Sequence, residues 1–511
     1  MKTLAVIVAL CFLTVANLFA AMDFYRATDV QPPAVPREFR AAWISEVASN
    51  ADWPSKPGLS VADQKAEMIS LLDRAMELHL NAVVFQVRPA SDTLYASPYE
   101  PWSELLTGTQ GKPPTPFYDP LAFAIEEAHK RGLELHAWFN PFRARLPTAK
   151  SAPAWNHISR THPEFIRRYG DQTWLDPGNP AVRAYVLTVV KDVVKRYDVD
   201  GVQFDDYFYP YPQTDANGHA LDFPDCETWK KFGAPLQLTR DAWRRANVNK
   251  FIYAAYAMIK AEKPWVRVGV SPFGIWRPGY PPQIRGLDSY ASLYADSRLW
   301  LASGWVDYLS PQLYWPVDSR QQSFPVLLDW WQKQSVKGRA LWPGLGAAYV
   351  GKTLTVNDIE EQVRILRKTP GVDGEIFFHL NNLIRDPDLE SFIRAANTNA
   401  ALVPAMPWLF SGAPAQPALY VAANTPEALT FNWQANDVPK QWLLQYVGTN
   451  DVWTTRIYPA DQRGCTFTKT RPKIIAISAV DHYGNVSPPA VLQRVVAPAP
   501  QRTGKTPLFM Y

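Results

Sequence analysis

Residues 38–396 repeat one pattern of apolar and polar positions. A short apolar run is followed by a loop rich in proline, glycine and aromatic residues, and then by a segment with the amphipathic period of a helix. The runs predict eight strands, at Phe39–Ile44, Ala82–Arg88, Leu133–Asn140, Gly201–Asp206, Arg267–Pro272, Tyr308–Tyr314, Ala340–Leu345 and Gly374–Leu380. The intervening helices are predicted near 63–79, 119–131, 180–197, 239–262, 290–302, 325–336, 356–368 and 387–396. Eight strand–helix units in this order predict an α/β fold, a (β/α)8 TIM barrel, over residues 37–398.

The chain changes character after residue 403. Short runs with period-two alternation, such as "QWLLQYV" (441–447), are separated by turn residues. They predict a small all-β sandwich over residues 404–497, followed by a loose tail over 498–511. The segment "AISAVDHYGNVSPP" (476–489) resembles the end of a fibronectin type III domain.

The N-terminus has one lysine, an apolar stretch from Leu4 to about Phe19, and the small residues Ala20 and Ala21. These features are typical of a signal peptide over residues 1–21, and they predict a secreted or periplasmic protein. An uncleaved membrane anchor is the alternative. The apolar run is shorter than the roughly 20 residues that a spanning helix needs, which favours the signal peptide.

Composition narrows the class of partner. The 52 basic and 48 acidic residues nearly balance, without a basic run that would follow a phosphate backbone, so we expect no nucleic-acid partner. Nothing in the sequence predicts a stable protein partner. The 20 tryptophans and 23 tyrosines favour flat surfaces that stack on sugar rings. His136, His219 and His379 lie in separate segments without metal-ligand spacing, so we expect no metal, and no motif predicts another cofactor.

Alternation along the strands sorts side chains between the helices and the barrel axis. In the fourth strand, Val202 and Phe204 suit the helix-facing layer, which directs Gln203 and Asp205 to the axis and leaves Asp206 at the rim. The same parity predicts an inward set from four other strands, made of Gln86, Arg88, Glu134, His136, Trp138, Asn140, Ser310, Gln312, Tyr314, Glu375, Phe377, His379 and Asn381. Polar groups therefore converge toward the C-terminal mouth, where TIM-barrel enzymes have their active sites.

Six ordered segments carry a family resemblance. They are "REFRAAWISEVASNADWPS" (37–55), "NAVVFQVRPASDTLYAS" (81–97), "HAWFNPFRA" (136–144), "DGVQFDDYFYPYP" (200–212), "GVSPFGIWR" (269–277) and "LSPQLYW" (309–315). Together they resemble the glycosyl-hydrolase-like family 10, secreted or envelope-attached bacterial TIM-barrel proteins. The resemblance implies a glycosidase that acts on cell-envelope polysaccharide, with peptidoglycan glycan strands stripped of their peptides as the substrate class.

Most glycosidases use two carboxyl groups. We interpret Asp205 and Asp206 as the acid/base or nucleophile pair, since like charges so close raise one pKa and suit a proton donor. Glu46 and Asp52, on the loop after the first strand, are the reserve candidates for the other carboxylate. "DGVQFDDY" also resembles the family 18 chitinase strand, in which Asp205 matches the residue that orients an acetamide, Tyr314 matches a supporting tyrosine and Tyr207 replaces the catalytic glutamate. The mechanism therefore stays open.

The predicted substrate-binding residues surround this pair. They are Arg88, His136, Trp138, Asn140, Gln203, Tyr207, Trp276, Arg277, Gln312, Tyr314 and Trp315. The aromatic members, with Trp43, offer stacking faces, and core packing is the alternative for each. Arg88 and Arg277 suit the carboxylates of muramic acid residues, because arginine binds carboxylates through two parallel hydrogen bonds. An ion pair with Asp205 is the alternative interpretation of Arg88. For His136 and Glu134, the alternative is an internal network of buried polar groups.

Two other functions compete with glycosidase activity. The first is a glycan-binding barrel without turnover, because only one clear catalytic carboxylate position is evident. The second is a metal-dependent polysaccharide deacetylase, which would need a metal held by histidine and aspartate.

Overall fold

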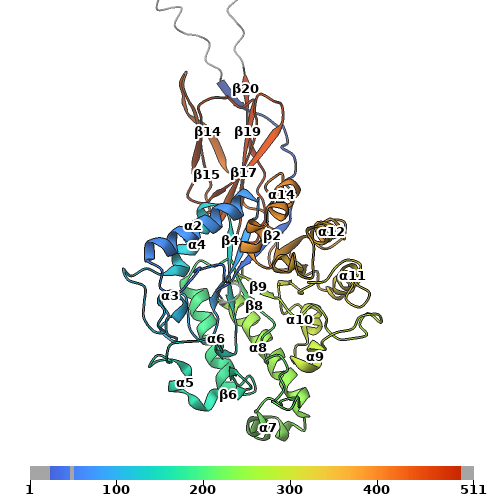
Figure 1. Cartoon of the computed structure of the whole chain (residues 1–511). Coiled ribbons are helices and arrows are strands. Elements are labelled where there is room, and N and C mark those ends of the chain that lie inside the picture. The colour runs from blue at the N-terminus through green and yellow to red at the C-terminus, as the bar shows by residue number, and fades with distance from the viewer. Residues whose placement is uncertain (1–23, 47–50, 496–511) are drawn as a thin grey trace, which may run out of the picture. The chain divides into compact units, whose positions relative to one another are not determined.

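The computed structural model describes residues 24–46 and 51–495, which form two compact units (Figure 1). One unit is continuous over residues 35–411, and the other combines residues 24–34 with residues 412–495. The predicted signal peptide (1–21) and tail (498–511) lie outside the described residues. Within the described residues, no helix has the length and hydropathy needed to cross a bilayer.

The larger unit is built on a parallel sheet in the order β11-β10-β9-β8-β4-β3-β2-β13-β12. The segments β11 and β12 are two pieces of one strand, so β10 pairs with the first piece and β13 with the second. The sheet thereby closes into an eight-stranded barrel, which confirms the predicted TIM-barrel class. The strands are β2 (Phe39–Ile44), β3 (Ala82–Arg88), β4 (Glu134–Phe139), β8 (Gly201–Phe204), β9 (Arg267–Val270), β10 (Tyr308–Leu309), β11 (Ala340–Leu341), β12 (Gly344–Leu345) and β13 (Gly374–Phe377).

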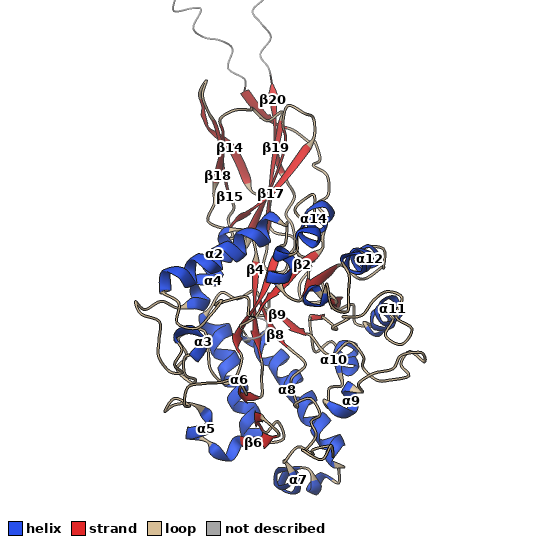
Figure 2. Cartoon of the chain, viewed as in Figure 1, coloured by secondary structure: helices blue, strands red, loops and turns tan. Residues whose placement is uncertain are grey.

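Eight helices lie around the strands (Figure 2), close to where the amphipathic period predicts them. They are α2 (Val61–Glu77), α4 (Pro120–Lys130), α6 (Pro180–Arg196), α8 (Arg240–Glu262), α10 (Ser297–Ser303), α11 (Phe324–Gln334), α12 (Val356–Leu366) and α14 (Pro387–Ala396). Most begin at a side-chain cap, as where Asp119 accepts from Ala122 N–H and Thr355 forms a capping box with Asp358.

The loops carry further short elements. An antiparallel sheet in the order β5-β7-β6 follows β4, and it consists of β5 (Arg143–Arg145), β6 (Ile166–Tyr169) and β7 (Gln172–Leu175). The short helices are α3 (Glu104–Thr107), α5 (Ile158–Thr161), α7 (Cys226–Phe232), α9 (Ser289–Ser292) and α13 (Leu380–Arg385). The β5 strand starts shortly after the end of β4, at the C-terminal end of the barrel strands.

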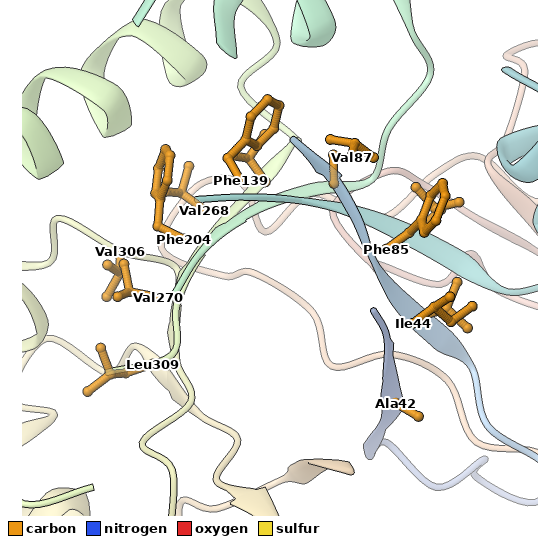
Figure 3. Close-up of a cluster of buried hydrophobic side chains, with 14 of the residues drawn as sticks. Ala42, Ile44, Phe85, Val87, Phe139, Phe204, Val268, Val270, Val306 and Leu309 are labelled. Carbon is orange, nitrogen blue, oxygen red and sulfur yellow. The ribbon is translucent and has the colours of Figure 1, made fainter. Parts of the chain in front are cut away.

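The two faces of the barrel strands pack into two different apolar layers. The layer toward the helices includes Ile44, Phe85, Phe139 and Phe204 (Figure 3), and the inner layer includes Trp43 and Tyr308. The predicted parity therefore holds for the third and fourth strands.

The inward prediction for Phe377 is wrong. Ile376 is the register partner of Ala41, and residues in register on parallel strands share a face. Since Ala41 lies in the inner layer, Ile376 joins it and Phe377 packs toward the helices.

The smaller unit is an antiparallel sandwich with two sheets, in the orders β1-β20-β19-β16-β17 and β14-β15-β18. Both sheets contribute to one core, with Phe431 and Trp433 from one and Trp442 and Ile477 from the other. The strands are β1 (Phe24–Ala27), β14 (Ala418–Asn424), β15 (Leu429–Gln434), β16 (Gln441–Val447), β17 (Trp453–Pro459), β18 (Gly464–Phe467), β19 (Ile474–Val480) and β20 (Ala490–Val495).

The division between the units differs in detail from the predicted ranges. Strand β1, which has no counterpart among the predicted elements, pairs with β20 and so joins the sandwich. Residues 404–411 belong to the barrel unit, where Pro404 O accepts from Arg267 Nη2 at 3.2 Å and Trp408 Nε1 donates to Asp307 at 2.9 Å.

Candidate active site

A cavity of about 400 Å³ opens at the C-terminal ends of the barrel strands. Its walls come from the ends of the strands and from the loops that follow them. The lining residues are Trp43, Ser45, Gln86, Trp138, Asn140, Arg143, Asp205, Asp206, Tyr207, Tyr211, Ser271, Phe273, Gln312, Tyr314, Tyr349 and Phe378. This is the position and size of a small-molecule binding site in a TIM barrel.

Asp205 and Asp206 both lie in this cavity, and they are the only carboxyl groups among its described lining residues. Each is at most 4% exposed. Asp205 accepts from Tyr207 N–H at 3.2 Å and from Asn140 Nδ2, and Asp206 accepts from the Tyr211 hydroxyl. Asp206 is therefore not an exposed rim residue: strand β8 ends at Phe204, so strand alternation does not direct the next two side chains to opposite faces.

Burial controls the protonation of the pair. It raises the pKa of Asp205 to about 7, with the charge of Arg143 lowering that pKa and the charge of Asp206 raising it further. Burial raises the pKa of Asp206 as well, against the hydrogen bond from Tyr211. Two interacting acids lose their protons in steps that belong to the pair, and both shifts disfavour the doubly ionised state.

A chain of amides fixes the orientation of the Asn140 side chain. The backbone N–H of Glu46 donates to Gln86 Oε1 at 3.0 Å, and Gln86 Nε2 donates to Asn140 Oδ1 at 2.6 Å. Because a backbone N–H can only donate, the Gln86 side chain must present its oxygen to Glu46 and its NH₂ group to Asn140. Asn140 must then direct its NH₂ group at Asp205, which it does.

Aromatic side chains form much of the cavity wall. Trp43 donates from Nε1 to Gln203 Oε1 at 2.6 Å, which holds its ring at the end of β2. Tyr314 and Phe378 stack with ring centroids 5.7 Å apart, and Trp138 is the last residue but one of β4. Such faces suit the apolar sides of pyranose rings.

The structure brings five of the eleven predicted substrate-binding residues into the cavity lining. These are Trp138, Asn140, Tyr207, Gln312 and Tyr314. Gln203 lies behind the wall, where it supports Trp43. The other five do not line the cavity.

Arg88 is withdrawn from the axis by a bulge in β3. The register shifts at Val87, so Gln86 pairs with Trp138 but Arg88 pairs with Phe139, whose ring faces the helices. The Arg88 guanidinium binds Glu100 through two bonds of 2.7 and 2.6 Å, and it donates to Asn140 O at 2.6 Å. Neither predicted partner, Asp205 or a substrate carboxylate, is therefore its partner here.

His136 belongs to a buried network below the cavity. Its ring nitrogens lie 3.2 Å from Glu134 and 2.9 Å from the Tyr308 hydroxyl, and Arg267 donates to Glu134 at 2.9 Å. The structure thus places His136 in the internal network that was its alternative interpretation.

Trp276, Arg277 and Trp315 lie outside the cavity wall. Trp276 donates to Asp296 at 3.1 Å and stacks on Trp330, with ring centroids 5.8 Å apart. Arg277 pairs with Asp288 at 3.3 Å. Trp315 packs its edge against Phe273, one shell behind the lining residues.

The reserve carboxylates also lie outside the cavity lining. Asp52 accepts from the backbone N–H groups of Ser45 and Asn381, each at 2.8 Å, and faces His379 Nδ1 at 2.6 Å. It therefore joins the loop after β2 to the end of the eighth strand. The Glu46 carboxyl is buried, accepts no hydrogen bond from a described residue, and has a pKa raised well above its usual value by burial.

Sequence reasoning missed several lining residues. Arg143 and Tyr211 stand inside quoted motifs, "HAWFNPFRA" and "DGVQFDDYFYPYP", three and five residues beyond the side chains that parity identified. Tyr349 ends a short 3-10 helix over Ala347–Tyr349, a segment for which the sequence pattern predicted no element. Phe378 lies within the predicted eighth strand, where parity did not select it, but the strand ends one residue earlier, at Phe377. Among the residues that the structure describes, no group of three histidine, cysteine, aspartate or glutamate side chains is placed to hold a metal ion.

A parallel barrel with a buried acid pair among aromatic side chains at its mouth defines a TIM-barrel glycoside hydrolase. Residues 38–360 match the model of the family "Glycosyl hydrolase-like 10", and the chain belongs to this family. "Glycosyl hydrolase YngK" of Bacillus subtilis is 42% identical over 398 residues, which cover 75% of this chain and 76% of that protein. "Glycosyl hydrolase DigH" of Escherichia coli is 36% identical over 385 residues, which cover 68% of this chain and 85% of that protein.

Among solved structures, the glycoside hydrolase domain of PgaB (BpsB) from Bordetella bronchiseptica matches with a TM-score of 0.45 and 16% identity, over 70% of this chain and 98% of that one. The predicted family and glycosidase class are confirmed by the family model and the two relatives.

Replacing Glu100 with glutamine is expected to destabilise the barrel by about 3–5 kcal/mol, because it leaves the charge of Arg88 buried without a counter-charge. Chemical denaturation followed by tryptophan fluorescence measures the change. Glu126→Gln is the matched control, since its partner Lys130 is on the surface, and it should leave the transition unchanged. Equal transitions for both variants would contradict the structural role of the Arg88–Glu100 pair.

Gln86→Glu tests the amide chain. The new carboxylate still accepts from Glu46 N–H, but it also accepts from Asn140, whose carbonyl oxygen then turns toward Asp205. We expect the pKa of Asp205 to rise by roughly one unit, because its carboxylate loses a donor and gains a negative neighbour. Carbon-13 NMR titration of the Asp205 carboxyl measures this directly.

Gln64→Glu is the control for that titration. Gln64 is a buried glutamine whose Nε2 donates to Leu59 O and Leu106 O at 3.0 Å, away from the cavity. Gln64→Glu should lower the free energy of unfolding and leave the pKa of Asp205 unchanged. A normal Asp205 titration in Gln86→Glu would show that the amide chain does not orient Asn140.

Proposed function

We propose that this glycosidase cleaves bacterial cell-envelope polysaccharide, and specifically peptidoglycan glycan strands that have lost their peptides. The observation that carries the proposal is the acid pair Asp205–Asp206, buried together in a cavity with aromatic walls. With one proton on the pair, the site has an acid and a carboxylate at once, which are the two forms that glycoside hydrolysis needs.

The proposed reaction begins when a sugar of the strand stacks on the wall formed by Trp43, Trp138 and Tyr314. The protonated carboxyl of the pair donates its proton to the glycosidic oxygen as the bond to the leaving sugar breaks. The ionised carboxyl stabilises the positive charge that develops on the anomeric carbon, as nucleophile, as base for water, or through a neighbouring acetamide. Arg143 and the donors from Asn140 and Tyr211 hold that negative charge in place.

The substrate assignment has two supports. The sequence motifs resemble a family whose members act on peptidoglycan strands, and the predicted signal peptide over residues 1–21 would export the chain to that polymer. We propose a secreted or periplasmic location on this basis. The cavity wall, with stacking faces and amide or hydroxyl donors, suits N-acetylated sugars.

Asp205→Asn is expected to lower the release of reducing ends from purified denuded strands by about 10²–10⁴-fold, which is the usual contribution of a general acid or base. The variant should still sediment with insoluble strands, because its aromatic wall is intact. Asp241→Asn is the control, an equal change at a side chain that is 60% exposed on α8. Full activity in Asp205→Asn would overturn the assignment.

The pH–rate profile should be bell-shaped, with the alkaline limb near pH 7. Activity needs the singly protonated pair, so it falls as pH rises through the upper pKa of about 7 and falls again in acid, where the second carboxylate takes up a proton. The measurement is kcat/KM for strand cleavage from pH 4 to 10. An alkaline limb absent below pH 9 would exclude a proton donor with this pKa.

A further inference from the structure

We propose that Arg143 binds the free lactyl carboxylate of a muramic acid residue and thereby selects strands from which the peptides have been removed. This rests on the proposed function above and adds the residue that reads the substrate. The sequence had suggested Arg88 and Arg277 for such a role, but Glu100 and Asp288 occupy them.

Arg143 has unused hydrogen-bonding capacity in the cavity. It is the only positively charged side chain among the described lining residues, and it is 7% exposed. Its side chain makes one hydrogen bond with the described residues, a long contact of 3.4 Å from Nη1 to Pro89 O, and it forms no ion pair with them. A guanidinium has five N–H donors, so most of them remain for a ligand.

The guanidinium is also held in position before any ligand arrives. It lies over the Tyr207 ring at 4.4 Å and near the Trp174 ring at 5.7 Å. Its backbone oxygen accepts from the Ser91 hydroxyl at 3.0 Å, which fixes the start of β5. A preorganised cation loses little conformational entropy on binding, and stacking leaves the edge of its plane free for a bidentate carboxylate.

The charge of the site explains why a carboxylate would need this arginine. Asp205 and Asp206 already make the cavity acidic, and a further carboxylate beside them would be repelled in a buried space. Arg143 acts on both aspartates without forming an ion pair with either, so its charge is still available to a third acidic group.

The lactyl group differs chemically between strands with and without peptides, and this difference makes the contact with Arg143 selective. In a peptide-bearing strand the lactyl carboxyl is an amide, which has no charge and offers one acceptor oxygen. Removal of the peptide restores a carboxylate with two equivalent oxygens, which match the arginine fork. A site built for a charged group discriminates strongly against a neutral analogue, because its own charge is then left unpaired.

The test compares two forms of one substrate, denuded strands and the same strands with their lactyl carboxyls converted to methylamides. The methylamide removes the charge without adding a peptide, so it separates charge recognition from steric exclusion. We expect the wild type to cleave the carboxylate form with a kcat/KM at least tenfold higher. Arg143→Gln should bring this ratio close to one, chiefly through KM on the carboxylate form, and Arg143→Lys should give an intermediate ratio.

The ratio of kcat/KM on the two substrates is independent of the second effect of Arg143, which is its effect on the pKa of Asp205. Its charge lowers the pKa of Asp205, so Arg143→Gln moves the pH profile, but it does so for both substrates, and the ratio taken at each variant's own optimum cancels the shift. Arg145→Gln is the matched control, an arginine on the same strand whose Nη2 donates to Ser151 O outside the cavity, and it should keep the wild-type ratio.

Each outcome has one meaning. A wild-type ratio retained in both Arg143→Gln and Arg143→Lys would overturn the carboxylate-reading role while the proposed function stands. Cleavage of neither substrate by the wild type would overturn the proposed function itself. If Arg143→Gln fails to fold, the ratio of the lysine variant decides, because lysine keeps the charge and lacks the fork.

Discussion

Two carboxyl groups buried next to each other cannot both stay charged without compensation, and the site is arranged around this constraint. Burial is the main cause that raises the pKa of Asp205 to about 7, and the charge of Asp206 adds to it. The surrounding groups offset part of that cost: a backbone N–H and the Asn140 amide donate to Asp205, and a tyrosine hydroxyl donates to Asp206. The result is a pair whose double ionisation is disfavoured, which suits one carboxyl to donate a proton while the other is ionised.

The barrel supplies those compensating groups through contacts that are themselves buried. Asn140 is held twice. Arg88 binds its backbone oxygen, and Gln86 orients its amide through a bond whose direction is set by the N–H of Glu46. Arg88 in turn depends on Glu100, so an ion pair outside the cavity fixes the position of a group inside it. Residues outside the cavity lining, such as Glu100 and Glu46, thus help to set the protonation of the acid pair inside it.

Arg143 connects the electrostatics of the acid pair to the choice of substrate. It lowers the pKa of Asp205 through its charge, it lines the cavity, and its side chain makes one hydrogen bond with the described residues. In the proposal developed above, the same guanidinium recognises the carboxylate that appears on a glycan strand when the peptide is removed. A single buried cation would then link the processed state of the polymer to the acid pair that cleaves it.

The linear order of residues was enough to predict the eight strand–helix units, the class of fold and the position of Asp205 at the mouth of the barrel. Hydrophobic period and strand parity are local properties, so they survive without knowledge of the tertiary structure, and parity correctly placed Trp138, Asn140 and Tyr314 in the cavity wall. Parity failed where local geometry changed. The bulge at Val87 turned Arg88 away from the axis, the pairing of β13 with β2 placed Phe377 outside, and the end of β8 at Phe204 left Asp206 inside. Only the tertiary structure could bring in Arg143, Tyr349 and Phe378. Arg143 and Tyr349 lie on short elements between the barrel strands and helices, and Phe378 lies just beyond the end of β13. The direction of such segments is set by packing against distant parts of the chain rather than by their own sequence.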